Sequence, residues 1–217
     1  MAENINQNLH QERKVYKKSS LSINNTENNP ISQFDIWYQE AAALKTFEAN
    51  AMVLSTVDDK GFPHSRIVLL KSYSDKGFIF YSNYNSLKGQ DLEKNPKVSL
   101  LFFYEQMERQ IRISGEVVKL SEEENDQYFY SRPLESQLGA MVSPQSSIIP
   151  SKEILEVELE KLKNSNKKPQ RPKHWGGYLI KASYFEFWQG RPSRLHDRIC
   201  FERHLNDEFW NKFTIAP

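Results

Sequence analysis

Five ionisable side chains crowd a short stretch near the C-terminus. The stretch WQGRPSRLHDR, residues 188–198, contains Arg191, Arg194, His196, Asp197 and Arg198. It directly follows the aromatic, strand-like run YFEFW that ends at residue 188. A solvated loop can carry such charges without a function, whereas a site that binds an anion and a flat ring requires these residue types. The rest of the sequence has to decide between the two interpretations.

Lys88 is a second candidate for anion binding. It falls in the first turn of a predicted helix preceded by Ser82 and Ser86, where free backbone N–H groups already favour a phosphate. The stretch QSS at 145–147 adds neutral hydrogen-bond donors. Each of these residues taken alone is more simply explained as a surface charge or a helix cap.

A third group of polar side chains lies on a later predicted helix. Tyr128 and Arg132 are four residues apart and share one helical face, and Ser136 follows one turn later, beyond Pro133. A phenol, a guanidinium and a hydroxyl that converge would suit a second phosphate. Together with Lys88, they predict two separated anion pockets with aromatic walls, one for a phosphorylated cofactor and one for a phosphorylated substrate.

Arg66 and Lys71 flank the apolar, strand-like run IVLL. Their positions have opposite parity, so a regular strand would direct the two side chains to opposite faces of a sheet. They are therefore not expected to perform the same task.

Bulk composition limits the classes of function. The 217 residues suffice for one domain with a real core, or for one domain and a tail. With 29 Lys and Arg against 28 Asp and Glu, no global field attracts nucleic acid, which is not expected as a partner. Cys200 is the only cysteine and the five histidines lack ligand spacing, so the sequence predicts neither an internal disulfide nor a metal site.

Common catalytic and targeting signatures are absent from the sequence. It contains no glycine-rich dinucleotide motif, no phosphate-binding P-loop and no GxSxG hydrolase motif. The N-terminus lacks a signal-peptide core, and no apolar run approaches transmembrane length. We therefore expect a soluble, cytoplasmic protein with no membrane partner.

Hydrophobic periodicity divides the chain into a tail and one domain. Residues 1–30 are polar and are expected to form a flexible segment, whereas 31–217 carry the signals of ordered structure. Ser32 and Asp35 have the spacing of a capping box at the start of a helix. A helical stripe runs through Phe34, Trp37, Ala41 and Leu44.

The remaining signals predict an α+β fold. Further helices are expected over 86–95, over 121–130 with a Ser121–Glu124 capping box, after Pro133, and over 154–162 with Ser151 as its cap. Strand signals cover 51–57, 65–71, 78–82, 98–103, 109–118, 178–188, 198–203 and 209–215. The sum is one domain with a mainly antiparallel sheet, curled into a barrel and flanked by peripheral helices.

Nine ordered blocks carry a family resemblance. They are SRIVLLK (65–71), FYSN (80–83), NPKVSLLF (95–102), ERQIRISG (108–115), SRP (131–133), SQLGA (136–140), SPQSS (143–147), FWQG (187–190) and RLHDR (194–198). In order and spacing they resemble the pyridoxine/pyridoxamine 5′-phosphate oxidases, from about Arg13 to Pro217. The resemblance implies an FMN-binding split barrel over 31–217, and a homodimer with FMN at each of two sites between subunits.

The resemblance also implies which residues contact the cofactor. The set matches Arg66, Ile67, Val68, Leu69, Leu70, Lys71, Tyr81, Ser82, Lys88, Gln110, Gln145, Ser146, Trp188 and Arg198. The family usually has arginine beside the phosphate-binding lysine, whereas Leu87 precedes Lys88 here.

The implied substrate site consists of a phosphate anchor, ring contacts and a covering segment. The phosphate anchor matches Lys71, Tyr128, Arg132 and Ser136. Arg194 and His196, the implied catalytic residues, lie with Leu195 against the pyridine ring. The tail 1–30 covers the bound substrate through Arg13, Lys14, Val15 and Tyr16.

The implied reaction is the oxidation of pyridoxine or pyridoxamine 5′-phosphate by O2. It yields pyridoxal 5′-phosphate and H2O2, with ammonia released from the amine. Two alternatives remain open: a flavin oxidase of phenazine biosynthesis, and a non-catalytic flavin-binding split barrel. The substrate-phosphate set argues against flavin storage, which does not require those residues.

Overall fold

A nine-stranded antiparallel sheet dominates the computed structural model of the protein, which describes residues 14–217 except 166, 205–206 and 208. The strand order is β2-β1-β5-β6-β7-β4-β3, and β8 pairs with β7 and with β9. The strands are β1 (Ala51–Val57), β2 (Pro63–Leu69), β3 (Ser72–Ser74), β4 (Gly77–Asn83), β5 (Lys97–Tyr104), β6 (Arg109–Lys119), β7 (Trp175–Gln189), β8 (Asp197–Glu202) and β9 (Asn211–Thr214).

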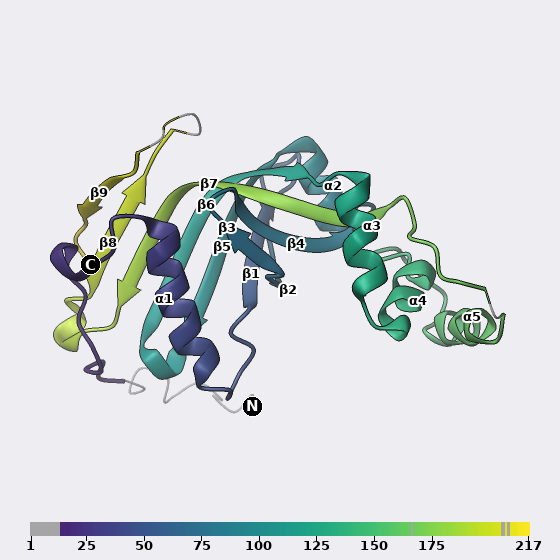
Figure 1. The fold of residues 1–217 in the computed structure, drawn as a ribbon, viewed down its shortest axis with the longest axis horizontal. Helices are drawn as coiled ribbons and strands as arrows, with labels where there is room; N and C mark the ends of the chain where they lie inside the picture. The colour runs from purple at the N-terminus through teal and green to yellow at the C-terminus, as the bar shows by residue number, and fades with distance from the viewer. Residues whose placement is uncertain (1–13, 166, 205–206, 208) are drawn as a thin grey trace, which may run out of the picture.

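Five α-helices surround this sheet. They are α1 (Pro30–Ala43), α2 (Leu87–Lys94), α3 (Glu122–Ser131), α4 (Leu134–Val142) and α5 (Glu153–Asn164). Three short 3-10 turns complete the described structure: η2 (Ile23–Asn25), η3 (Glu105–Met107) and η4 (Pro192–Arg194). Helices α3, α4 and α5 gather at one end of the molecule, and β8 and β9 lie at the other (Figure 1).

Strand β7 gives the sheet its curled shape. It pairs with β6 along most of its length, with β4 over its first six residues, and with β8 over its last six. A register shift between Ser114 and Gly115 bends the β6–β7 ladder, as β-bulges do. The sheet curls far enough for β2 to approach β4. The predicted mainly antiparallel α+β fold with peripheral helices is therefore confirmed.

The core fills the concave side of this curled sheet. Burial alternates strictly along β1, which is the pattern of a strand with one face in the core. Helix α1 covers the core with Phe34, Trp37 and Ala41, each almost fully buried. The ring of Phe34 packs against four aromatic rings, those of Tyr38, Tyr73, Phe78 and Phe102.

Of the two capping boxes predicted from the sequence, one starts a helix in the structure and the other does not. The Ser121–Glu124 capping box is confirmed: the Ser121 N–H donates to Glu124 Oε2 at 2.9 Å. The predicted start of α1 at the Ser32–Asp35 box is wrong. Asn29 Oδ1 accepts from the Ile31 N–H at 2.8 Å, so Asn29 is the N-cap, three residues before Ser32, and Pro30, whose fixed φ suits a first helical position, starts the helix.

Two other predicted boundaries are also wrong. Because α1 ends at Ala43, Leu44 lies beyond the buried stripe and is 40% exposed. Helix α5 begins at Glu153 with Lys152, and not Ser151, at its N-cap.

The strand predicted over 65–71 ends instead at Leu69. The Leu70 N–H donates to Asn50 O, beside β1, whereas the Lys71 N–H donates to Ile79 O in β4. The chain thus changes pairing partner within two residues, so it is not one regular strand from Arg66 to Lys71, and the alternation of side chains along a strand does not apply to this pair.

None of the described helices is long and apolar enough to span a bilayer.

The aromatic cluster around Phe34 should dominate the stability contributed by α1. We expect Phe34→Ala to lower the free energy of unfolding by about 3–5 kcal/mol, because it leaves a cavity among four rings. Phe62→Ala is the matched control: Phe62 is 64% exposed, and its removal should cost less than about 0.5 kcal/mol. Urea unfolding followed by circular dichroism measures both, and equal losses would contradict this account of the core.

Candidate active site

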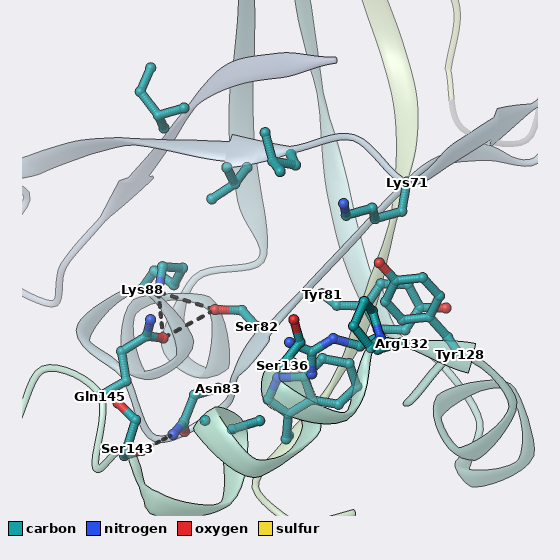
Figure 2. Close-up of a pocket in the computed structure, with 17 residues that line it drawn as sticks. Lys71, Tyr81, Ser82, Asn83, Lys88, Tyr128, Arg132, Ser136, Ser143 and Gln145 are labelled. Atoms are coloured by element: carbon teal, nitrogen blue, oxygen red, sulfur yellow. Dashed lines mark hydrogen bonds between the residues drawn. The ribbon is translucent and has the colours of Figure 1, made fainter. Parts of the chain in front are cut away.

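A cavity of about 690 Å³ opens between β2, β4 and the helices α2, α3 and α4. This volume lies in the usual range for small-molecule sites. Seventeen residues line it: Ile67, Val68, Leu69, Lys71, Tyr81, Ser82, Asn83, Lys88, Tyr128, Arg132, Pro133, Ser136, Gly139, Ala140, Ser143, Gln145 and Trp175. Figure 2 shows their polar side chains in two groups, one around Lys88 and one around Arg132.

The first group centres on a buried lysine. Lys88 is only 8% exposed, and its Nζ donates to Ser82 Oγ and Gln145 Oε1, each at 3.1 Å (Figure 2). It also donates to Ser86 Oγ at 3.0 Å. Among the described residues, no carboxylate lies within ion-pair distance of this ammonium group. Burial, with a smaller contribution from Arg66, lowers the pKa of Lys88 to about 8.

Local sequence explains why Lys88 points into the cavity. Ser86 is the N-cap of α2, and its hydroxyl accepts from the Gly89 N–H, so the helix starts at the cavity wall. An uncompensated cation beside a helix N-terminus is a strong binding element for a phosphate, which would supply the missing negative charge.

The second group centres on an arginine packed among aromatic rings. The Arg132 guanidinium lies 4.5 Å from the ring centroid of Trp175, and its buried Nη1 has no hydrogen-bond partner within the described part of the chain. The rings of Tyr81 and Tyr128 stack beside it, with centroids 3.8 Å apart. Burial lowers the pKa of Arg132, which nevertheless stays charged at neutral pH. An anionic ligand in the cavity would accept a hydrogen bond from this unpaired guanidinium nitrogen.

Lys71 and Ser136 complete this second group. Lys71 follows β2, lies on the same side of the cavity as Tyr128 and directs its ammonium group toward the middle of the cavity (Figure 2). Ser136 lies in the first turn of α4, and Gly139 and Ala140 follow it on the same helical face. Gly139 has no side chain and Ala140 has only a methyl group, so this face of α4 leaves space for a flat ligand.

A separate aromatic cluster lies where β7 ends. The ring of Trp188 lies 5.7 Å from that of Tyr16 and 4.6 Å from that of His196. His196 Nδ1 accepts from the Arg191 N–H at 3.1 Å, so the neutral ring carries its proton on Nε2. Burial and then the neighbouring Arg194 lower the pKa of His196, in agreement with a neutral ring.

Two features fix the loop between β7 and β8. Ser193 and Arg194 both have left-handed backbone conformations, with φ of 56° and 62°, which is uncommon for residues other than glycine. Arg198 Nε donates to Glu186 Oε1 at 2.8 Å, and Arg112 Nη1 donates to Glu186 Oε2 at 3.0 Å. The Glu186 carboxylate is 1% exposed and holds the Arg198 guanidinium in one orientation.

The cavity and the aromatic cluster are far apart within one chain. Trp175, on the cavity wall, and Trp188, in the cluster, stand at opposite ends of β7, thirteen residues apart. At about 3.3 Å per residue, that is roughly 40 Å along the strand. A cavity of about 690 Å³ cannot bridge this distance, so one chain does not join the two groups.

Two family models together match most of the chain. The model described as pyridoxamine 5′-phosphate oxidase matches residues 39–166, and that of the pyridoxine 5′-phosphate oxidase C-terminal dimerisation region matches 175–217. The chain belongs to the pyridoxamine 5′-phosphate oxidase family. The family prediction made from the nine sequence blocks is therefore confirmed.

Similar proteins of this family come from distant bacteria. The chain is 50% identical to a pyridoxine/pyridoxamine 5′-phosphate oxidase of Leptospira interrogans over 207 residues, covering 94% of this chain and 96% of that one. It is 47% identical to the protein of the same name from Trichormus variabilis, with the same coverage.

Solved structures share the split-barrel fold of this oxidase family. PhzG from Burkholderia lata, crystallised with tetrahydrophenazine-1-carboxylic acid, matches with a TM-score of 0.86 and 27% identity, covering 93% of this chain and all of that one. A pyridoxamine 5′-phosphate oxidase-related, FMN-binding protein from Nostoc punctiforme matches with a TM-score of 0.73 and 15% identity, covering 88% of this chain and all of that one.

The structure distributes the predicted site residues of this family member over two places. The cavity holds eleven of them: Ile67, Val68, Leu69, Lys71, Tyr81, Ser82, Lys88, Gln145, Tyr128, Arg132 and Ser136. The Lys88 and Arg132 groups, predicted as two separated pockets, line one continuous cavity. The β7 end holds Tyr16, Trp188, His196, Arg194, Leu195, Arg198 and, paired with Trp188 across the sheet, Gln110.

The other predicted residues lie outside both places or outside the described chain. Arg66 donates to Leu54 O and Thr56 Oγ1, and Leu70 is a core residue. Lys14 pairs with Glu105 on the surface, and Val15 is 66% exposed. Ser146 follows Gln145 with a positive φ but does not line the cavity, and Leu87 is likewise absent from its lining. Arg13 lies outside the described residues.

Sequence reasoning missed several residues of the cavity wall. They are Asn83, Pro133, Gly139, Ala140, Ser143 and Trp175. A usable signal existed for Gly139 and Ala140, since they follow Ser136 at helical spacing. No comparable signal marks Trp175, because the predicted strand began three residues later, at 178. Among the described residues, no cluster of three or more His, Cys, Asp or Glu side chains is arranged to hold a metal ion.

The lowered pKa of Lys88 predicts a measurable pH dependence of stability. The folded-state pKa is about 8, below the ordinary value of 10.5, so the unfolded chain binds more protons between these two pH values. Stability should therefore rise with pH across this window, by about 1–2 kcal/mol between pH 7.5 and 9.5, relative to Lys88→Met. Urea unfolding of the cofactor-free protein at both pH values measures the difference, and identical pH dependence in the two proteins would contradict the assignment.

Proposed function

We propose that this protein is an FMN-dependent oxidase that converts pyridoxine or pyridoxamine 5′-phosphate to pyridoxal 5′-phosphate. The alcohol and O2 give the aldehyde and H2O2; the amine, O2 and water give the aldehyde, H2O2 and ammonia. One observation carries the proposal: a single cavity is lined by two cations, the buried Lys88 and the half-buried Arg132, neither of them paired with a carboxylate among the described residues. FMN and these substrates each bring one phosphate monoester.

The residues present fit FMN on one side of the cavity. Lys88, Ser82 and Gln145 form a compact set of hydrogen-bonding groups with an uncompensated positive charge, which suits the cofactor phosphate. Bound FMN would supply the redox chemistry, a two-electron oxidation at C4′ of the substrate followed by reoxidation with O2.

The second group serves the substrate in this proposal. Arg132 and Lys71 bind its phosphate, and the hydroxyls of Tyr128 and Ser136 donate further hydrogen bonds. This anchoring fixes the position of the pyridine ring, so that C4′ is already oriented toward the cofactor when the substrate binds. The chain's task is positioning and charge placement, because the electron transfer belongs to the cofactor.

We further propose that the active site is completed by a second copy of the chain. An apolar row crosses three adjacent strands on the outer face of the sheet, where Val53 pairs with both Ile67 and Leu101. Ile67 is 64% exposed and Phe103, beyond Leu101, is 54% exposed. Exposed apolar patches of this kind mark protein interfaces. The row continues into the cavity through Ile67, which lines it.

In such a homodimer the two separated groups of one chain would serve different sites. The cavity of one subunit would receive His196 and Arg194 of the partner subunit against the substrate ring. With His196 Nδ1 already accepting from the backbone, the proton on Nε2 is free to donate to the substrate. The match of residues 175–217 to a dimerisation region supports this arrangement.

The likeness to PhzG keeps a phenazine-type oxidase as the second candidate function. The TM-score of 0.86 favours it, whereas 50% identity to a named pyridoxine/pyridoxamine 5′-phosphate oxidase over almost the whole chain favours the first. The chemical difference is the substrate phosphate, for which the Arg132 group provides an anchor.

Turnover in air tests the proposed function directly. We expect the FMN-loaded protein to convert pyridoxamine 5′-phosphate to pyridoxal 5′-phosphate with one H2O2 per aldehyde. Aldehyde is measured as its phenylhydrazone and peroxide by a coupled peroxidase. An FMN-loaded protein that oxidises a dihydrophenazine carboxylic acid but neither B6 phosphate would favour the second candidate, and one that oxidises none of these would indicate flavin binding alone.

Two cavity variants should separate the two phosphate anchors. Arg132→Ala should raise KM for pyridoxamine 5′-phosphate about 10- to 100-fold and leave the FMN dissociation constant within about twofold, because only the substrate loses a charged contact. Lys88→Ala should weaken FMN binding by a similar factor.

Lys94→Ala is the matched control for these variants. Lys94 lies on the same helix as Lys88 and pairs with Asp59 on the surface, so neither constant should change. Steady-state kinetics and flavin fluorescence titration give both constants. Equal loss of FMN in Arg132→Ala and Lys88→Ala would contradict the division of the cavity.

A further inference from the structure

A buried glutamate holds the segment that leads to Tyr16. Glu108 is 3% exposed and follows η3 at the turn into β6. Its Oε2 accepts from the backbone N–H of Lys17 at 2.8 Å and of Lys18 at 2.9 Å. One side chain therefore fixes the chain immediately after Tyr16, some ninety residues away in sequence.

The backbone of Glu108 also fixes the end of β7. Its carbonyl oxygen accepts from the Gly190 N–H at 2.7 Å and from Gln189 Nε2 at 3.1 Å. Glu108 has φ of 56°, in the left-handed region where glycine is favoured. A strained backbone at a residue whose side chain and carbonyl both make long-range bonds is a feature associated with functional sites. Glu108 thus ties the segment 14–18 and the loop after β7 to one point.

Tyr16 fits closely against that loop. Its ring packs edge-on to both Trp188 and His196, with centroids 5.7 and 5.8 Å away. A Cβ placed on Gly190 would lie 2.7 Å from Tyr16 Cγ and 2.8 Å from Tyr16 Cβ. Only glycine at 190 therefore leaves room for the observed position of Tyr16.

A second carboxylate anchors the segment farther along. Asp197 Oδ2 accepts from the Leu21 N–H at 2.8 Å, and Arg191 Nη1 donates to Ser19 O at 2.9 Å. The purple segment in Figure 1 accordingly runs along the end of the sheet that carries β8 and β9. Loss of the Glu108 anchor would leave residues 14–18 with the exposed contacts of Lys14 to Glu105 and of Lys18 to Gln106 O, while Leu21 stays attached.

We propose that Glu108 is a positioning residue that seats the segment 14–18, so that Tyr16 packs on Trp188 and His196 and closes the ring-binding end of the site. The expected effect of Glu108 on KM rests on the proposed function, because the contacts of Tyr16 and His196 with the substrate are part of that proposal. Glu108 acts through the segment and does not itself touch the reacting atoms.

Limited proteolysis tests the anchor without any activity measurement. Trypsin cleaves extended chains after lysine, and the segment offers Lys14, Lys17 and Lys18. In the FMN-loaded protein we expect Glu108→Ala to be cleaved there about 10- to 100-fold faster than wild type, since two hydrogen bonds to a carboxylate are lost. Mass spectrometry identifies the cleavage sites.

Two further variants make the proteolysis specific. Glu105→Ala is the matched control: this glutamate lies on the same turn and pairs with Lys14, but the pair is exposed, so cleavage should change less than about fivefold. Glu108→Gln keeps an oxygen acceptor and should restore most of the protection. If Glu108→Ala is cleaved no faster than Glu105→Ala, the anchor does not exist as proposed.

Kinetics then test the seating of Tyr16. Glu108→Ala and Gly190→Ala should both raise KM for pyridoxamine 5′-phosphate about tenfold or more, with FMN affinity unchanged, whereas Glu105→Ala should match wild type. Gly190→Ala keeps the Glu108 side chain, so it decides the question if Glu108→Ala does not fold. If the segment 14–18 is cleaved faster but KM is unchanged in both variants, the packing of Tyr16 on Trp188 and His196 does not contribute to substrate binding and this part of the proposal is wrong. Wild-type protein without turnover would instead refute the proposed function and leave the proteolysis result standing.

Discussion

Strand β7 is the constraint on which the rest of the architecture depends. Its fifteen residues pair with β6, β4 and β8, so its two ends cannot approach each other without breaking a ladder. Trp175 at its start and Trp188 at its end are therefore held apart. Each end gathers its own set of ligand-type side chains, and the proposed active site requires both sets.

Cations without a carboxylate partner in the described part of the chain give the cavity its chemical character. Removing a charge from water is costly unless a partner compensates for it, and the partners of the buried Lys88 among the described residues are hydroxyl and amide oxygens. The lowered pKa of Lys88 records that cost. At the other end of β7 the opposite arrangement holds, since the carboxylate of Glu186 is neutralised by Arg112 and Arg198. A bound phosphate monoester would supply the countercharge that Lys88 lacks, whereas the buried carboxylate of Glu186 already has its countercharges.

The sequence predicted local features well and non-local ones poorly. The Ser121–Glu124 box starts α3 as predicted, because capping depends on neighbouring residues alone. The strand predicted over 65–71 ends at Leu69 because the chain changes pairing partner there, which no local pattern encodes, although only Lys71, and not Arg66, lines the cavity. Ordered blocks identified the family, yet they could not show that Lys88 and Arg132 share one cavity, since that depends on how distant helices pack.

The central claim is that each active site takes its residues from two chains, and subunit complementation tests it most directly. Arg132→Ala impairs the cavity and His196→Ala impairs the β7 end, so each homodimer should be nearly inactive when the substrate concentration lies well below the raised KM. A purified heterodimer of the two variants would have one site with both defects and one site with none. The account predicts about half of the wild-type activity per dimer. A heterodimer no more active than its parents would contradict it and place the whole site within one chain.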